Sequence, residues 1–300
     1  MAATIGPVAP LTAAATTPGR NGRIIFQDRA SGQLFTVNPD GSQLRQVTHV
    51  GFNTTPDWSP DGRRITYASD RSGIVQIWIA AADGSSARQL TPDTNPNDKR
   101  HPQFTPDGRT IVYQDCLGDG CDGGISAVRT DGTQLPAITP NSGESYNWPM
   151  PSPDGRRLAF MRWHVAGVKM RIFVMPVGGG FERPITPAWI GAWAPDWAPN
   201  GRQIVFSSHT YQDRPNGAIF TVRPDGTGLQ RLTSPPWPLE DWHASYAPDS
   251  TKLVFSSDRR YPDRCCADLY LMNADGSSMH RIPLTSTQAV LARWGTAPLL

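Results

Sequence analysis

Short hydrophobic segments separated by polar turns run along most of the chain. In residues 64–68 (Arg-Ile-Thr-Tyr-Ala) polar and apolar side chains alternate, and residues 75–79 repeat this pattern after an Asp-Arg-Ser-Gly turn. Such alternation predicts β-strands, and Asp-Gly pairs between the segments predict hairpins. The pattern therefore predicts short antiparallel strands along the chain.

An aliphatic residue followed by threonine marks the end of each repeat of this pattern. Six such pairs occur, at Val47-Thr48, Leu90-Thr91, Ile138-Thr139, Ile185-Thr186, Leu232-Thr233 and Leu284-Thr285. Each pair follows the same order of strands and turns, so the chain consists of one unit repeated.

A Pro-Asp-Gly turn, usually preceded by an aromatic residue, measures the repeat. It occurs with substitutions at residues 58–62, 104–108, 151–155, 197–201 and 246–250. Its prolines, at positions 60, 106, 153, 199 and 248, lie 46, 47, 46 and 49 residues apart. A period of about 40 to 50 residues with several short strands per unit is typical of propeller blades.

The two ends of the chain complement each other. The first unit begins at Gly22 without an innermost strand, and residues 292–295 supply such a strand with no unit after it. Pairing these segments closes the ring and removes an exposed sheet edge. We therefore predict an all-β fold over residues 22–300, a single six-bladed β-propeller of four-stranded antiparallel blades closed by the N- and C-terminal strands.

Residues 1–21 differ from the repeats and are expected to form a flexible leader. They are rich in Ala, Thr and Pro, carry no charge before Arg20, and have an apolar stretch broken by Pro7 and Pro10. This composition fits neither a signal peptide with a basic start nor a membrane span. It is compatible with the start of a mature exported protein, periplasmic or secreted, although a cytoplasmic location stays open.

Composition narrows the range of partners. The 28 glycines and 29 prolines fall at turns, and the formal net charge is only +2 with no basic stripe. Nucleic acid is therefore a poor candidate partner, and we expect a monomer without a membrane span. The four cysteines form two local pairs, Cys116 with Cys121 and the adjacent Cys265 and Cys266. Disulfides, free thiols and a zinc site are the alternatives, and the wide separation of the pairs disfavours zinc.

A family resemblance rests on one stretch of the second unit. The run Trp58-Ser-Pro-Asp-Gly-Arg-Arg-Ile-Thr-Tyr-Ala-Ser-Asp-Arg71, with Asp83-Gly84 and Leu90-Thr91 after it, resembles the TolB-type, WD-repeat-like propeller repeat. The resemblance covers residues 22–295. It implies a β-propeller related to TolB, a periplasmic component of a cell-envelope complex, and hence protein–protein interaction.

Aligning the units on the turn proline identifies the side chains expected to face the central channel. Three residues before the proline stand Asp57, Gln103, Met150, Asp196, Ser245 and, in the closing strand, Arg293. Five residues before it, on the same side by alternation, stand Thr55, His101, Trp148, Ala194, His243 and Leu291.

Two functional hypotheses follow from this alignment. His101 and His243 are three units apart, as are Asp57 and Asp196, so these four residues are candidate ligands for a divalent metal, either calcium or a transition metal. A metal site would favour a lyase or hydrolase acting on a carbohydrate. Oligogalacturonate lyases, which have similar repeats and a histidine-rich metal site, illustrate this alternative.

The preferred hypothesis is non-catalytic binding of a protein, peptide or glycan over the channel. The connections between units are aromatic, and Trp and Tyr offer large rigid contact areas with a polar group. No nucleophile elbow, phosphate-binding loop or dinucleotide motif occurs. The candidate ligand-binding residues at the channel mouth are His101, Tyr146, Trp148, Trp193, Asp241, Trp242, His243 and Arg293.

Overall fold

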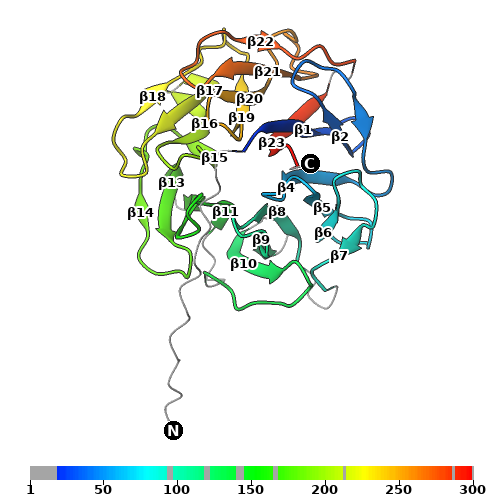
Figure 1. Cartoon of the computed structure of the whole chain (residues 1–300). Coiled ribbons are helices and arrows are strands. Elements are labelled where there is room, and N and C mark those ends of the chain that lie inside the picture. The colour runs from blue at the N-terminus through cyan, green and yellow to red at the C-terminus, as the bar shows by residue number, and fades with distance from the viewer. Residues whose placement is uncertain are drawn as a thin grey trace.

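The protein is an all-β propeller whose antiparallel sheets surround a central channel (Figure 1). This computed structural model describes residues 19–92, 97–117, 122–139, 145–164, 168–211, 214–285 and 288–298. No helix occurs in these ranges, and so none that is long and apolar enough to cross a membrane. The predicted leader lies almost wholly outside them.

Four sheets have four strands each. The first joins the two ends of the chain and contains, in order, β23 (Ala289–Thr296), β1 (Asn21–Asp28), β2 (Gln33–Val37) and β3 (Arg45–Gln46). The second contains β4 (Asn53–Trp58), β5 (Arg64–Ser69), β6 (Gln76–Ala81) and β7 (Arg88–Gln89). The others are β15 (Ala192–Trp197), β16 (Ile204–Tyr211), β17 (Arg214–Val222) and β18 (Gln230–Arg231), and β19 (Asp241–Tyr246), β20 (Lys252–Ser257), β21 (Asp268–Asn273) and β22 (His280–Arg281).

The third and fourth repeat units share one seven-stranded sheet. It contains β8 (Lys99–Phe104), β9 (Thr110–Leu117), β10 (Asp122–Arg129), β11 (Ser145–Pro151), β12 (Arg157–His164), β13 (Val168–Pro176) and β14 (Arg183–Pro184). A single parallel bridge between Gly123 and Ser145 joins β10 to β11. The prediction of six separate four-stranded blades is therefore wrong here. The long β9–β10 hairpin reaches the next innermost strand, and the fourth strand of the third unit is reduced to an isolated bridge from Val128 to Gln134.

The threonine that ends each repeat has a local structural role. In five units its side-chain oxygen accepts a hydrogen bond from a backbone N–H of the third strand, as in Thr48 with Leu34 (2.8 Å) and Thr91 with Ile77 (3.0 Å). The same contact occurs at Thr139, Thr186 and Thr233. These hydroxyls satisfy backbone donors that the two-residue outer strands leave unpaired.

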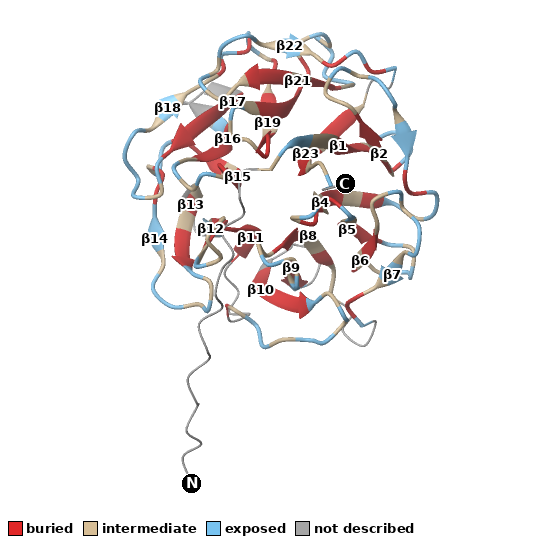
Figure 2. Ribbon diagram, viewed as in Figure 1, coloured by how far each residue is buried: buried red, intermediate tan, exposed pale blue. Residues whose placement is uncertain are grey.

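The core lies between neighbouring sheets. Ile77 and Ile79 of one sheet pack with Phe104 and Tyr113 of the next, and each residue is almost completely buried. Figure 2 shows buried residues concentrated in the strands and exposed residues in the turns around the rim. Each fully buried Ile or Phe side chain stabilises the fold by about 1.5–3 kcal/mol. This packing holds the innermost strands around the channel.

Pairing of β23 with β1 closes the ring, as the sequence predicted. Ile24 pairs with Trp294 and Ile25 with Arg293 in an antiparallel register. The indole N–H of Trp294 also donates to the carbonyl oxygen of Gly22 (3.1 Å). The closing strand thereby takes the innermost position in the first sheet.

Candidate binding face and channel

Two rings of side chains from the innermost strands line the channel. The upper ring consists of Thr55, His101, Trp148, Ala194, His243 and Leu291, and the lower ring of Asp57, Gln103, Met150, Asp196, Ser245 and Arg293. All six lower-ring residues line a funnel at one mouth, and five upper-ring residues line a smaller pocket above it. The sixth, His101, stacks on Trp148. Both rings therefore lie where the alternation predicted.

Backbone geometry explains how the upper ring points into the channel. All six of its residues have positive φ values, between 47° and 55°. In the innermost strands β4, β8, β11, β15 and β19 the pairing register shifts at this point, which is the signature of a β-bulge. Positive φ is unfavourable for residues other than glycine. Because it recurs in every unit, the strain belongs to the fold and is not confined to one functional position.

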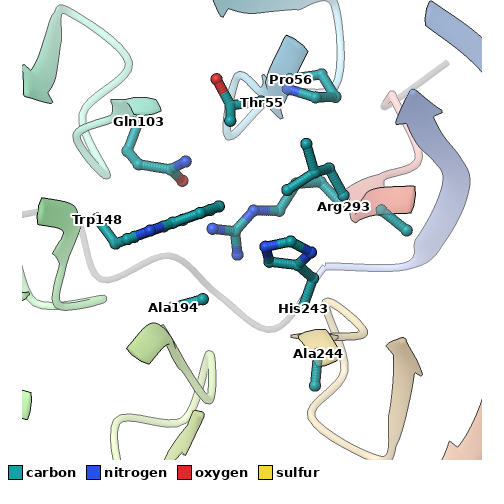
Figure 3. Close-up of a pocket in the computed structure, with 10 residues that line it drawn as sticks. Thr55, Pro56, Gln103, Trp148, Ala194, His243, Ala244 and Arg293 are labelled. Carbon is teal, nitrogen blue, oxygen red and sulfur yellow. The ribbon is translucent and has the colours of Figure 1, made fainter. Parts of the chain in front are cut away.

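An aromatic cluster fills the upper mouth. We define the aromatic plug as His101, Trp148, Trp193, His209 and His243. The Trp148 ring stacks on His101 with centroids 3.7 Å apart and lies 5.0 Å from the His243 ring. The Trp193 ring lies 4.6 Å from that of His243 and stacks on His209 at 4.7 Å. In Figure 3 Trp148, His243 and Arg293 converge on the middle of the channel. The plug leaves only about 20 Å³ of hollow space in the pocket below it.

The buried imidazoles of the plug are neutral. Burial lowers the pKa of His101 to about 3, and its Nδ1–H donates to Oε1 of Gln114 (2.8 Å). Burial, followed by the charges of neighbouring residues, also holds the pKa of His243 well below its ordinary value. Both ring nitrogens of His243 are buried without a hydrogen-bond partner among the described residues.

The four candidate metal ligands do not converge. The Trp148 indole contacts both His101 and His243, while Asp57 and Asp196 belong to the lower ring. Within the described ranges no group of three or more His, Cys, Asp or Glu side chains is arranged to hold a metal ion. The sequence alignment identified residues from opposite units correctly, but it could not show the indole that packs against both imidazoles.

The lower ring carries the charges of the channel. Arg293 forms an ion pair with Asp196 at 2.8 Å. The Asp57 and Asp196 carboxylates accept hydrogen bonds from the backbone N–H groups of Phe104 and Tyr246, both at 2.8 Å. Burial raises the pKa of Asp57 to about 6, although the Arg293 charge opposes the rise. These carboxyls therefore connect neighbouring innermost strands as well as facing the funnel.

Other predicted ligand-binding residues differ in their accessibility. Tyr146 is buried and donates its hydroxyl hydrogen to Glu182 (2.7 Å). Asp241 is fully buried and pairs with Arg259 at 2.6 Å. Both side chains are therefore engaged in internal contacts. Trp242 is half-buried, at the position equivalent to Trp193.

Three of the four cysteines lie within the described residues. Cys116 is buried, and its predicted partner Cys121 lies outside the described residues. Cys265 and Cys266 are unbridged thiols whose sulfur atoms lie 2.7 Å apart. Of the alternatives that the sequence left open, this second pair has free thiols.

Most exposed large apolar side chains among the described residues lie on one face of the molecule. We define the upper face as the connections that lead into the innermost strands, together with the ends of the hairpins between the second and third strands. Six of the seven exposed large hydrophobic residues among those described lie there: Val50, Phe52, Leu117, Trp163, Trp189 and Trp237. Only Phe181 lies in a turn of the opposite, lower face. Trp189 and Trp237 belong to the connections whose aromatic character the sequence indicated, whereas Trp163 lies within β12 and gave no such signal.

The fold and the channel define an all-β propeller with an aromatic upper face and a charged lower ring. The chain matches the TolB β-propeller domain over residues 13–145 and 125–297, and it belongs to this family. This confirms the resemblance found in the repeat sequence.

Individual relatives agree with this assignment. A TolB homolog from Chlorobium luteolum is 29% identical over 281 residues, which are 92% of this chain and 60% of the relative. An uncharacterized protein of Agrobacterium fabrum is 27% identical over 158 residues, half of each chain (50% and 52%). An uncharacterized peptidase of Bacillus subtilis is 28% identical over 158 residues, 52% of this chain but 22% of the peptidase. The chain therefore spans less than two thirds of each of these relatives.

Solved structures show the same fold. TolB from Acinetobacter baumannii has a TM-score of 0.74 at 18% identity, covering 91% of this chain and 66% of that one. A putative TolB from Agrobacterium tumefaciens has a TM-score of 0.67 at 21% identity, with coverage of 93% and 99%. An oligogalacturonate lyase in complex with manganese has a TM-score of 0.55 at 15% identity, with coverage of 87% and 72%. At these identities the likeness concerns the fold alone.

Proposed function

We propose that this chain is a non-catalytic TolB-like propeller that binds a protein or peptide on its upper face. The observation that carries the proposal is that six of the seven exposed large hydrophobic side chains among the described residues lie on this face, three of them tryptophans. Trp163, Trp189 and Trp237 are 49%, 46% and 67% exposed. Exposed tryptophans in one region are typical of interaction surfaces, because the rigid indole buries a large area at little entropic cost.

The closed upper mouth supports surface binding over catalysis. The plug packs ring against ring, and the pocket beneath it is small and enclosed by side chains from all around the channel. Small-molecule sites usually have about 300–1,000 Å³ of hollow space with convergent polar groups. A partner that contacts the rim tryptophans and the top of the plug needs no such hollow.

Relatives named TolB support both the type of ligand and an extracytoplasmic location. TolB-type propellers imply protein–protein interaction in the cell envelope, and we extend that role to this chain as part of the proposal.

Selection from a phage-displayed peptide library tests this proposal, with fluorescence anisotropy of the enriched peptides as the measurement. The double variant Trp189→Ser and Trp237→Ser should bind these peptides about tenfold or more weakly, because each exposed indole acts as an anchor. Phe181→Ser, on the lower face, is the matched control and should leave the affinity unchanged. Peptides that bind the double variant as tightly as the parent protein would argue against the upper face.

The metal content of the purified protein distinguishes the binding proposal from the metal-dependent alternative. Metal analysis of the purified protein is paired with the double variant His101→Ala and His243→Ala. Stoichiometric metal that disappears in this variant would favour a metal-assisted lyase or hydrolase. Enriched oligosaccharide binding in place of peptide binding would redirect the proposal towards a glycan ligand.

A further inference from the structure

The lower mouth of the channel opens into a much larger hollow than the upper one. The funnel has about 800 Å³ of hollow space, against about 20 Å³ for the pocket under the plug. Its wall consists mainly of the repeated turns and contains Pro60, Pro106, Pro153, Pro199 and Pro248. This volume lies within the range of about 300–1,000 Å³ usual for ligand sites and has room for a short extended peptide segment.

The floor of the funnel has an unbalanced charge. It contains two carboxyl groups, Asp57 and Asp196, and one guanidinium, Arg293. Arg293 pairs with Asp196, whereas no described cation forms an ion pair with Asp57. The charged residues at the rim, Arg20, Arg63 and Asp61, are solvent-exposed and therefore screened by water and salt. A single added positive charge would neutralise the floor.

Two residues that line the funnel each carry a polar group that is buried behind the wall without a hydrogen-bond partner in the described part of the chain. The indole N–H of Trp58 and the hydroxyl of Tyr246 are unpaired within the described residues, and the side chains are only 9% and 4% exposed. A buried unpaired donor costs about 1–3 kcal/mol. The prolines and aromatic rings of the wall offer apolar contact to a ligand such as a peptide.

We propose that the funnel binds an extended peptide segment through one lysine or arginine side chain, whose cationic group pairs with Asp57. The site is distinct from the upper face and does not depend on the function proposed for it. An anionic ligand is disfavoured because the floor already carries a net negative charge. Asp57 keeps a carboxylate that the fold desolvates without a full counter-charge, and a cationic ligand compensates for that cost.

Three capped heptapeptides of alanine and proline test this site, with lysine, glutamine or glutamate at the centre and fluorescein as the label. Acetylated and amidated ends remove the terminal charges. In anisotropy titrations at pH 7.5 the lysine peptide should bind about tenfold or more tightly than the glutamine peptide, because a charge-assisted hydrogen bond is stronger than a neutral one. The glutamate peptide should bind weakest.

Asp57→Asn should reduce the affinity for the lysine peptide to that for the glutamine peptide. Asparagine keeps an acceptor for the Phe104 N–H, so the fold is preserved, and a melting curve confirms this. The matched control Asp131→Asn makes the same change of charge in an exposed outer turn of the same face and should not alter binding.

The pH dependence supplies an independent readout. The charged groups that face Asp57 are Arg293 and Asp196, and burial also raises the pKa of Asp196. Lowering the pH from 7.5 to 5 protonates Asp57 and should weaken binding of the lysine peptide, whereas Asp57→Asn should flatten this response. Equal binding of the lysine and glutamine peptides would overturn the proposal. So would unchanged binding by folded Asp57→Asn, or loss of binding in the Trp189→Ser and Trp237→Ser variant, which would place the peptide on the upper face.

Discussion

Asp57 both stabilises and destabilises the folded protein. Its carboxylate accepts the backbone N–H of Phe104 from the neighbouring innermost strand, which helps hold two strands together. Burial nevertheless raises its pKa to about 6, so the ionised form is disfavoured in the folded protein. An acid with a raised pKa in the folded state stabilises the protein at low pH, and this contribution is lost as the pH rises through that pKa.

Replacing Asp57 by asparagine should therefore change the pH dependence of stability. From pH 4 to pH 7.5 the free energy of unfolding of the parent protein should fall relative to that of Asp57→Asn by about 2–3 kcal/mol. The buried histidines are present in both proteins, so their opposite effect cancels in the difference. Urea unfolding at pH 4, 6 and 7.5 measures it. A difference that does not vary with pH would contradict the raised pKa.

The Pro-Asp-Gly turn shows how one element is adapted to its place in the ring. Gly62 and Gly201 hold equivalent positions in two units, with φ values of +66° and +70°. A β-carbon at Gly62 would lie 2.1 Å from the carbonyl oxygen of Thr296 in the closing strand, while nothing lies within 4 Å of one at Gly201. At Gly201 the turn thus requires glycine only for its positive φ. At Gly62 the closing strand also leaves no space for a β-carbon.

Alanine substitutions at these two glycines should separate the two requirements. Gly201→Ala should destabilise the protein by about 1 kcal/mol, the cost of a left-handed conformation for a residue with a β-carbon. Gly62→Ala should cost clearly more, because the Thr296 backbone must also move. Thermal and urea unfolding of both variants measure the difference. Equal destabilisation would mean that β23 is not packed against this turn.

Closure of the ring is a property of the whole molecule. The strand β23 pairs with β1, and Asp249 in the last unit exchanges hydrogen bonds with Asn21 (2.8 and 3.2 Å). These contacts join segments more than 200 positions apart in the chain, so they form only when all units are in place. They also leave no free edge on β1 that could pair with another molecule.

Deleting residues 289–300 should open the ring and expose the edge of β1. We expect a large loss of cooperativity in thermal unfolding and concentration-dependent association, seen by light scattering. Deleting residues 299–300 alone is the control and should leave both measurements unchanged. A truncated protein that stays monomeric with the parent melting curve would show that closure contributes little to stability.

Much of this architecture could be predicted because its signals are local and repeated. Pro-Asp-Gly at a regular spacing specifies hairpins, alternation specifies strands, and the complementary ends specify closure. The two channel rings followed from the same alignment. Strand count in the third and fourth units was not predictable, because the bridge from Gly123 to Ser145 depends on how far one hairpin extends towards the next strand.

By itself the sequence determined the repeat, the register of its strands, the closing pair and the residues that face the channel, since each depends on near neighbours or on exact repetition. Only the tertiary structure decided that Trp148 packs against both His101 and His243, that Tyr146 and Asp241 are buried, and that the larger hollow lies at the lower mouth. These outcomes depend on how side chains from different units fill one shared space. Packing between different units leaves no periodic pattern in the sequence.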